Sequence, residues 1–174
     1  MIRAALHRGS QFLTALAAEA RPPDDGPALV VLPQHLAVLF GRMAPPDRRH
    51  GLDVFHRLRA GGHTDPVLLQ AALLHDVGKA EAGITVVHRA ARVLLARRAG
   101  PLWRWLSGRP TGWRRPFWVV ANHAERGALW MTTQGASAEL VALVRYHELA
   151  APPEWAGTPQ ERRHAALAEV DALS

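Results

Sequence analysis

No cysteine occurs among the 174 residues of this chain. The absence excludes disulfide bonds, thiolate metal ligands and a cysteine nucleophile, and it is typical of proteins of the reducing cytosol. No apolar run approaches the roughly 18 residues that a membrane-spanning helix needs. Polar residues interrupt the apolar side chains of residues 1–20, which predicts a short amphipathic helix rather than a signal peptide. We therefore expect a soluble, cytoplasmic protein with no membrane partner.

Lysine is almost as scarce, because Lys79 is the single lysine among 21 basic residues. Lysine and arginine differ in geometry and hydration, so a lone lysine indicates a place where a compact ammonium group is required. The formal net charge of +6 would attract phosphate-bearing partners. The arginines are scattered in pairs, however, and no nucleic-acid motif is recognisable, so nucleic acid is not an expected partner.

Strand signals are also missing, since no segment alternates apolar and polar residues and no internal repeat occurs. Apolar residues recur at helical spacing instead, which predicts an all-α fold of about seven or eight helices. Residues 21–28 contain three prolines and a glycine and are expected to form a linker. The predicted organisation is an N-terminal helix and Pro-rich linker over residues 1–28, followed by one helical domain over residues 29–174.

The helical pattern can be followed along the predicted domain. Asp65 and Pro66 are typical of an N-cap and a first helical residue, and the helix after them is apolar almost all round, which predicts burial on most sides. The Trp-rich residues 101–112 are expected to be a partly helical connection on the surface of the core. The other expected helices fall in residues 29–43, 47–62, 84–100, 113–131, 137–149 and 159–174.

The buried helix ends in a histidine and an aspartate, His75 and Asp76. Burying both side chains costs free energy unless they are paired or bind a metal. A carboxylate and an imidazole together suit a divalent ion of Mn, Fe, Co, Ni, Zn or Mg. We expect Gly78 to let the chain turn away and leave room at this site. The dipeptide is common by chance, so the prediction depends on its context, which includes Lys79.

In that context the chain resembles the HD-domain metal-dependent phosphohydrolases. The matching motifs are RRHGLDV, AALLHDVGK and LAEVDALS, in the family's order of His, His-Asp and Asp. The resemblance covers roughly residues 30–174 and is strongest over residues 50–80. It implies a compact HD-domain helical bundle and one divalent metal, whose four implied ligands are His50, His75, Asp76 and Asp171.

Two further histidines, His123 and His147, fall between the His-Asp pair and the last aspartate. Some HD-domain families use two such histidines for a second metal that the Asp of the pair bridges. The resemblance therefore leaves sites with one or with two ions open. Family members often have paired histidines where this chain has Asn122-His123 and Tyr146-His147. The chain also lacks the Gly-Tyr-Pro signature of the cyclic-dinucleotide phosphodiesterases in this family.

The implied activity is hydrolysis of a phosphate ester or anhydride, with a nucleotide or another small phosphorylated metabolite as substrate. A divalent ion lowers the pKa of bound water and polarises a phosphoryl oxygen. Asp76 would bind the metal and orient or deprotonate the water, and Lys79 would contact the phosphate and stabilise the departing charge. Arg49 is a second candidate for phosphate binding. Glu148 and Glu125 are candidates for a general acid.

Two other functions stay open at this point. A non-catalytic module would bind a nucleotide or protein and keep the metal for structure, and an HD-type oxygenase would use two irons. The role of the Trp-rich residues 100–118, at the pocket mouth or in a dimer contact, is also open. His164 lies two helical turns before Asp171 and could point toward the site. The histidines expected on surfaces or helix faces are His7, His35, His56, His63, His88 and His164.

Overall fold

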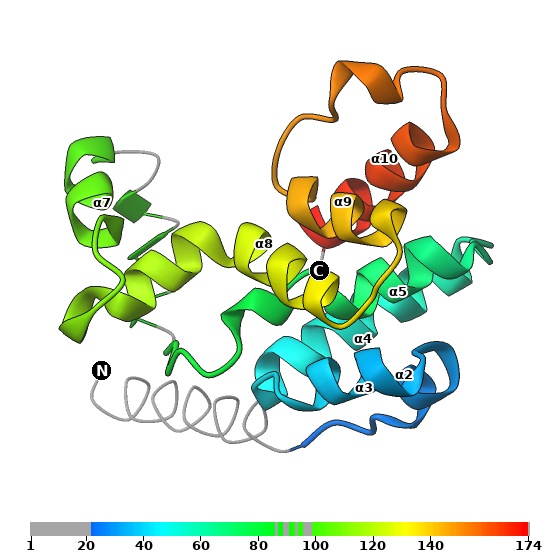
Figure 1. Ribbon diagram of the computed structural model, residues 1–174, viewed down its shortest axis with the longest axis horizontal. Coiled ribbons are helices and arrows are strands. Elements are labelled where there is room, and N and C mark those ends of the chain that lie inside the picture. The colour runs from blue at the N-terminus through cyan, green and yellow to red at the C-terminus, as the bar shows by residue number, and fades with distance from the viewer. Residues whose placement is uncertain (1–21, 86, 89–90, 93, 96–98, 174) are drawn as a thin grey trace, which may run out of the picture.

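The computed structural model describes residues 22–85, 87–88, 91–92, 94–95 and 99–173, and these residues form helices and connections without a strand. The prediction of an all-α fold is confirmed (Figure 1). No helix among the described residues is long and apolar enough to cross a membrane. The α-helices are α2 (Gly26–Val31), α3 (Gln34–Gly41), α4 (Pro45–Ala60), α5 (Pro66–Leu74), α7 (Gly100–Ser107), α8 (Arg115–Thr133), α9 (Ala138–Tyr146) and α10 (Pro159–Ala172). Three short 3-10 helices join them: η1 (Val77–Lys79), η2 (Gly112–Arg114) and η3 (Pro153–Trp155).

Helix α5 is the central element, and α2, α3, α4, α9 and α10 all pack against it. Asp65 caps it by accepting a hydrogen bond from Leu68 N at 3.0 Å, and Pro66 occupies its first turn. Its residues Leu68, Leu69 and Ala71 to Leu74 are all buried. The prediction of a helix buried on most sides is therefore confirmed. Its carboxyl end, where His75 and Asp76 follow, lies inside the bundle rather than at its surface.

Glycines allow two close approaches around this end of α5. A Cβ on Gly51 of α4 would lie 3.0 Å from Leu73 O, so α4 packs closely on α5 just after His50. A Cβ on Gly127 of α8 would lie 3.2 Å from Gly78 N. Helix α8 therefore lies directly against η1, and it also packs on α9. In Figure 1, α8 crosses the middle of the molecule, with α9 and α10 on one side of it and α7 at its far end.

The N-terminal part of the domain differs from the sequence prediction. Residues 29–43 were expected to be one helix, but Pro33 separates α2 from α3 and Leu32 is extended, because proline disfavours helical geometry in the residue before it. Helix α2 begins at Gly26 and buries Ala28, so the linker predicted over 21–28 is at least three residues shorter. The helix predicted over residues 1–20 lies outside the described residues.

The later helices agree better with their predictions. Helices α9 and α10 lie inside the ranges predicted for them, 137–149 and 159–174. Helix α8 ends two residues after its predicted range of 113–131. The Trp-rich connection over 101–112 contains all but the first residue of helix α7 and ends at the first residue of η2. Of the helix predicted over 84–100, residues 87–88, 91–92 and 94–95 are described and helical.

Candidate metal centre

Six side chains from five helices and their ends meet at the carboxyl end of α5. They form two groups of three, and within each group the potential ligand atoms all lie within 4.8 Å of one another. Each group is close enough to hold one metal ion. We call His50, His75 and Asp171 the first triad, and Asp76, His123 and His147 the second triad.

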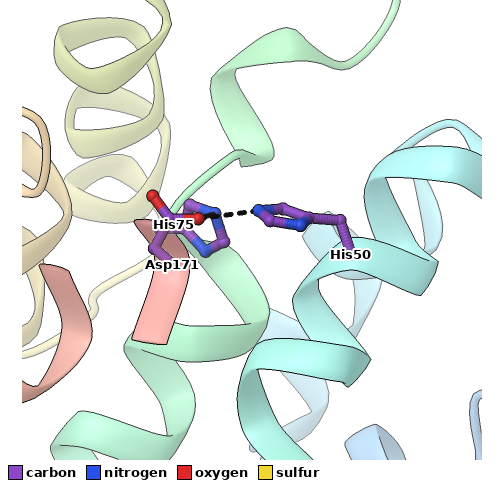
Figure 2. Close-up of side chains that lie close together, drawn as sticks. All are labelled: His50, His75 and Asp171. Carbon is purple, nitrogen blue, oxygen red and sulfur yellow. Dashed lines mark hydrogen bonds and ion pairs between the residues drawn. The ribbon is translucent and has the colours of Figure 1, made fainter. Parts of the chain in front are cut away.

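The first triad joins α4, α5 and α10. His50 projects from α4 toward Asp171 of α10, with His75 beside them at the end of α5 (Figure 2). His50 Nε2 lies 2.8 Å from Asp171 Oδ1 and donates a hydrogen bond to this carboxylate. His75 Nε2 lies 3.4 Å from the same oxygen. A single carboxylate oxygen therefore faces two imidazole nitrogens from residues that are far apart in the sequence.

The second triad is more deeply buried. His123 of α8 is fully buried, and Asp76 and His147 are 3% and 5% exposed. His123 Nε2 lies 3.2 Å from Asp76 Oδ1 and 3.3 Å from His147 Nε2. The two histidine nitrogens thus face each other across the position that a shared cation would take.

The two triads adjoin through His75 and Asp76. The His75 ring lies 5.1 Å from the ring of His50 and 5.2 Å from that of His147, measured between ring centroids. Its Nε2 also lies 3.7 Å from Asp76 Oδ2. The sequence prediction grouped Asp76 with His50, His75 and Asp171. In the structure Asp76 Oδ1 lies beside His123 of the second triad, and Asp76 Oδ2 lies beside His75 of the first, so the predicted four-residue ligand set stays a prediction.

Three of the histidines are oriented by the same device. In each, Nδ1 lies close to the backbone oxygen of the residue three positions earlier. The distances are 2.9 Å from His75 to Ala72, 2.9 Å from His123 to Val120 and 2.7 Å from His147 to Val144. Because a carbonyl can only accept, each Nδ1 carries the proton and each neutral ring keeps a lone pair on Nε2. Such outer hydrogen bonds are typical of metal-binding histidines, since they fix the tautomer and the direction of the ring.

The spacing and chemistry of these atoms fit a divalent ion. Two ligands about 2.1 Å from one ion lie about 3.0–3.4 Å apart in octahedral or tetrahedral coordination. The second-triad distances of 3.2 and 3.3 Å match this spacing. Two lone pairs that face each other in a buried place need a cation between them. His75 Nε2 is also buried and makes no hydrogen bond, although two carboxylates lie near it. Imidazole and carboxylate ligands suit the first-row divalent ions.

Both aspartates are held in the ionised form. Burial raises the pKa of Asp76, but the charges of Lys79 and His75 outweigh it and hold the pKa well below its usual range. Burial likewise raises the pKa of Asp171, and the hydrogen bond from His50 with the neighbouring imidazoles brings it well below the usual range. Ionised carboxylates are the form that binds metal, so each triad offers one anionic ligand at neutral pH.

The pKa values of two buried histidines, His147 and His75, are shifted in opposite directions. Burial lowers both values, and the neighbouring charges decide the net shift. Burial lowers the pKa of His147 to about 4, helped by the nearby charges of His75 and His123. For His75, burial also lowers the pKa, but the charges of Asp76 and Asp171 outweigh it and raise the value. His147 is therefore neutral and able to ligate at any pH above about 5.

Three charged residues line the approach to the second triad. Lys79 Nζ lies 2.6 Å from Asp76 Oδ2. Glu148 Oε1 lies 3.7 Å from His123 Nε2, and Glu148 Oε2 accepts a hydrogen bond from Arg92 at 2.7 Å. Burial raises the pKa of Glu148, but the charge of His123 and the bond to Arg92 lower it overall. Glu148 is thus a carboxylate at neutral pH, and its predicted role as a general acid stays a prediction.

A cavity of about 260 Å³ opens beside this approach. It lies between α8 and α9, and Asn122, Glu125, Tyr146 and Glu148 are among its lining residues. Glu148 therefore faces both the second triad and the cavity. Arg92 was not predicted as a site residue, because neither its spacing nor the local composition distinguishes it from the other arginines of residues 84–100.

The other predicted residues lie elsewhere or stay predictions. Glu125 is bound to Arg145 at 2.8 Å and is not among the residues that contact the triads. Arg49 is half-buried beside His50, and its phosphate contact stays a prediction. Gly78 allows the backbone of η1 to lie directly against α8, because a Cβ at this position would clash with the backbone oxygen of His123.

The remaining histidines are accounted for apart from His7, which lies outside the described residues. His35, His56 and His63 are exposed, as predicted. His88 is half-buried and bonded to Thr85. His164 was expected on a surface or a helix face, with the site as an alternative. It is buried against Trp155, its Nε2 lies 3.0 Å from Tyr146 O, and it belongs to neither triad.

Comparison with known proteins adds no relative to this geometry. No family model matches the chain, and neither a curated protein nor a solved structure does so.

Proposed function

We propose that this chain is a metal-dependent phosphohydrolase of the HD type that acts on a phosphate ester or anhydride of a small molecule. The observation that carries the proposal is the pair of adjoining triads, each with one ionised aspartate and two histidines, beside the single lysine of the chain. Adjacent divalent-ion sites are typical of enzymes that cleave phosphate esters. The resemblance of the His, His-Asp and Asp motifs to HD-domain phosphohydrolases supports the same activity.

The ligands would be the six triad residues, with one ion in each triad and with Mn, Fe, Co, Ni, Zn or Mg as candidate metals. A bound divalent ion supplies Lewis acidity at a phosphoryl oxygen and lowers the pKa of a bound water. Asp76 contributes one oxygen toward each triad and so would orient the attacking water between them. The buried wall of α5 and α8 excludes other water and strengthens these electrostatic interactions.

Lys79 and Arg92 would bind the phosphate. Lys79 stands 2.6 Å from Asp76, so its ammonium group can reach an oxygen of any phosphate held at this aspartate. A point charge there stabilises the negative charge that develops on the departing oxygen. Arg92 presents a guanidinium group held by Glu148 and by Val120 O. A phosphate would take bidentate hydrogen bonds from this group, in place of the Glu148 carboxylate.

The cavity between α8 and α9 would accommodate the rest of the substrate. Its volume of about 260 Å³ suits a small organic group, and it meets the metal centre at Glu148. This volume is at the lower limit of small-molecule pockets and favours a compact metabolite over a polymer.

Metal content and hydrolysis in one preparation test the proposal. We expect the purified chain to bind divalent metal, shown by elemental analysis, and to hydrolyse an aryl phosphate with added Mn²⁺. Asp76→Ala should lose at least about a hundredfold in rate, because it removes a ligand and the water contact. Asp53→Ala, at an exposed position of α4, is the matched control and should keep full activity.

The other outcomes separate the competing functions. Failure to bind metal after reconstitution would overturn the proposal entirely. Metal binding without turnover would favour a non-catalytic module. Bound iron with an oxygen-dependent absorbance change would favour an oxygenase.

A further inference from the structure

Residues 82–124 contain eight arginines and neither aspartate nor glutamate. The rest of the chain has 13 basic and 15 acidic residues, so its formal charge is slightly negative. The whole positive charge of this protein therefore comes from one continuous segment. Among the arginines of this segment that the structure describes, Arg104 and Arg109 are exposed, on α7 and shortly after it. Exposed positive charge favours anionic partners.

Within this segment, large apolar side chains are exposed on α7 and η2. Leu102 is 47% exposed, Trp105 is 54% exposed and Trp113 is 66% exposed. The rings of Trp105 and Trp113 lie 6.0 Å apart, and Leu102 lies one helical turn from Trp105, so the three form a continuous surface. The guanidinium of Arg114 lies over the Trp105 ring, and the exposed Arg104 and Arg109 lie close to these residues in sequence. We call this surface the α7–η2 face, formed by Leu102, Arg104, Trp105, Arg109, Trp113 and Arg114.

The fold holds this face at one end of the molecule. Helix α7 packs on α8 and lies far along α8 from α9 and α10 (Figure 1). Its inner side is anchored by the buried Leu106 and by Trp103, whose ring contacts Phe117 at 6.4 Å. Trp113 also contacts Phe117, at 6.3 Å between ring centroids, yet Trp105 and Trp113 both stay more than half exposed. Their exposure on an ordered helix indicates a partner.

Charge identifies the class of that partner. Two copies of this chain that met through the α7–η2 face would bring two acid-free segments together, so a symmetric dimer is disfavoured. A nucleic acid would stack its bases on the tryptophans, but the guanidinium of Arg114 covers the Trp105 ring at 4.2 Å. The aliphatic Leu102 would add nothing to base stacking. Tryptophan, leucine and arginine together are typical of helices at the interface of anionic lipid bilayers.

We propose that the α7–η2 face binds the surface of an anionic membrane. Trp105, Trp113 and Leu102 insert at the level of the headgroups, and Arg104 and Arg109 contact the lipid phosphates. The sequence prediction of no membrane partner rested on the lack of a spanning segment, which a peripheral contact does not need. The inference is independent of the hydrolase activity proposed above, because none of its residues belongs to the metal centre.

Vesicle co-sedimentation of the full chain tests this inference. We expect binding to vesicles of 30% phosphatidylglycerol in phosphatidylcholine to exceed binding to pure phosphatidylcholine by about tenfold or more. Raising the salt from about 0.1 M to 1 M should abolish most of the difference, because surface charges are then screened. Trp105→Ser/Trp113→Ser and Arg104→Glu/Arg109→Glu should each lower the partition coefficient about tenfold or more.

Matched variants and two parallel measurements exclude other occupants. Val38→Ser/Leu129→Ser removes two equally exposed apolar side chains from α3 and α8, and Arg57→Glu reverses an exposed charge on α4. These controls should bind vesicles like the unmodified chain. Equal binding to neutral and anionic vesicles would overturn the proposal. So would a dimer in sedimentation velocity that dissociates in Trp105→Ser/Trp113→Ser. Binding of a single-stranded oligonucleotide without vesicle binding, lost in the same variants, would assign the face to nucleic acid instead.

Discussion

Gly78 lies so close to His123 that a Cβ at Gly78 would stand 1.9 Å from the His123 backbone oxygen and 2.7 Å from Gly127 N. This contact joins η1, which follows Asp76 and carries Lys79, to the helix that carries His123. The second triad can form only while these two segments touch. Glycine is therefore required at position 78 by the neighbouring backbone rather than by its own conformation.

Gly78→Ala should damage both stability and metal binding. Because the methyl group meets rigid backbone, we expect a loss of about 3 kcal/mol in the free energy of unfolding. Chemical denaturation measures the loss, and elemental analysis should show less metal in the second triad. Gly41→Ala is the control, since a Cβ there meets nothing within 4 Å, and it should be neutral or slightly stabilising. Near-equal stability of the two variants would contradict the account of Gly78.

Metal stoichiometry should distinguish the two triads. We expect two equivalents of divalent ion in the unmodified protein after reconstitution. His50→Asn should lose the ion of the first triad and His123→Asn that of the second, each by removal of a nitrogen ligand. Elemental analysis and calorimetric titration measure both, with the exposed His56→Asn as control. Loss of both ions in either variant would show one shared site instead.

Asp65 should be a stability determinant that lies outside the centre. One of its oxygens caps α5 through Leu68 N, and the other binds Arg163 of α10 at 2.8 Å. Asp65→Ala should cost about 1–2 kcal/mol in urea denaturation, because it removes the cap and the ion pair. Asp65→Asn keeps a cap acceptor and should cost less than half as much. An equal cost for both variants would assign the effect to the ion pair alone.

His147 should make the metal-free protein less stable in acid. The pKa of His147 is about 4 in the folded chain, and its ordinary value is 6.5. Between these two pH values, the imidazole of the unfolded chain binds a proton and that of the folded chain does not. Stability contributed by neutral His147 is present above pH 6.5 and is lost as the pH falls toward 4, by about 3 kcal/mol in all. The free energy of unfolding should be measured in chelator across this pH range. Its slope against pH should be shallower in His147→Gln than in the unmodified chain, by about 1.4 kcal/mol per pH unit. Equal slopes would contradict the burial argument.

Arg92 tests the proposed phosphate contact. Arg92→Gln should raise KM about tenfold to a hundredfold while kcat changes only a few-fold, because the guanidinium binds substrate and product phosphate alike. Steady-state hydrolysis with saturating metal measures both constants. The exposed Arg57→Gln on α4 is the control and should leave KM unchanged. An unchanged KM in Arg92→Gln would remove Arg92 from the binding site.

The helices were predictable because their signals are local. The Asp65 cap, the apolar run of α5 and the spacing in α8 to α10 depend on neighbours in sequence, and each helix was found at or near its predicted position. Pro33 gave the same kind of signal, and it was outweighed in the prediction by apolar spacing on both sides. The helix boundary at Leu32 follows from proline geometry and was available from the sequence alone.

The site was only partly predictable. The six metal-ligand candidates were recognisable from motif order, but their division into triads depends on how α8 packs against η1, which no local pattern encodes. Arg92 reaches Glu148 across 56 residues. The surroundings of Glu148 were likewise not predictable, since His123 and Arg92, which lower its pKa, come from distant segments.

The hydrogen bond between His50 and Asp171 spans 121 residues, and it has a consequence for the order of assembly. All residues of the second triad lie at or before position 147, whereas the first triad waits for α10 to dock. A chain whose α10 is not docked would therefore have the complete second triad. In the first triad it would have His50 and His75 without the Asp171 carboxylate. Loading of the first triad therefore requires that α10 be docked. An ion held there would oppose the detachment of α10 from α4 and α5.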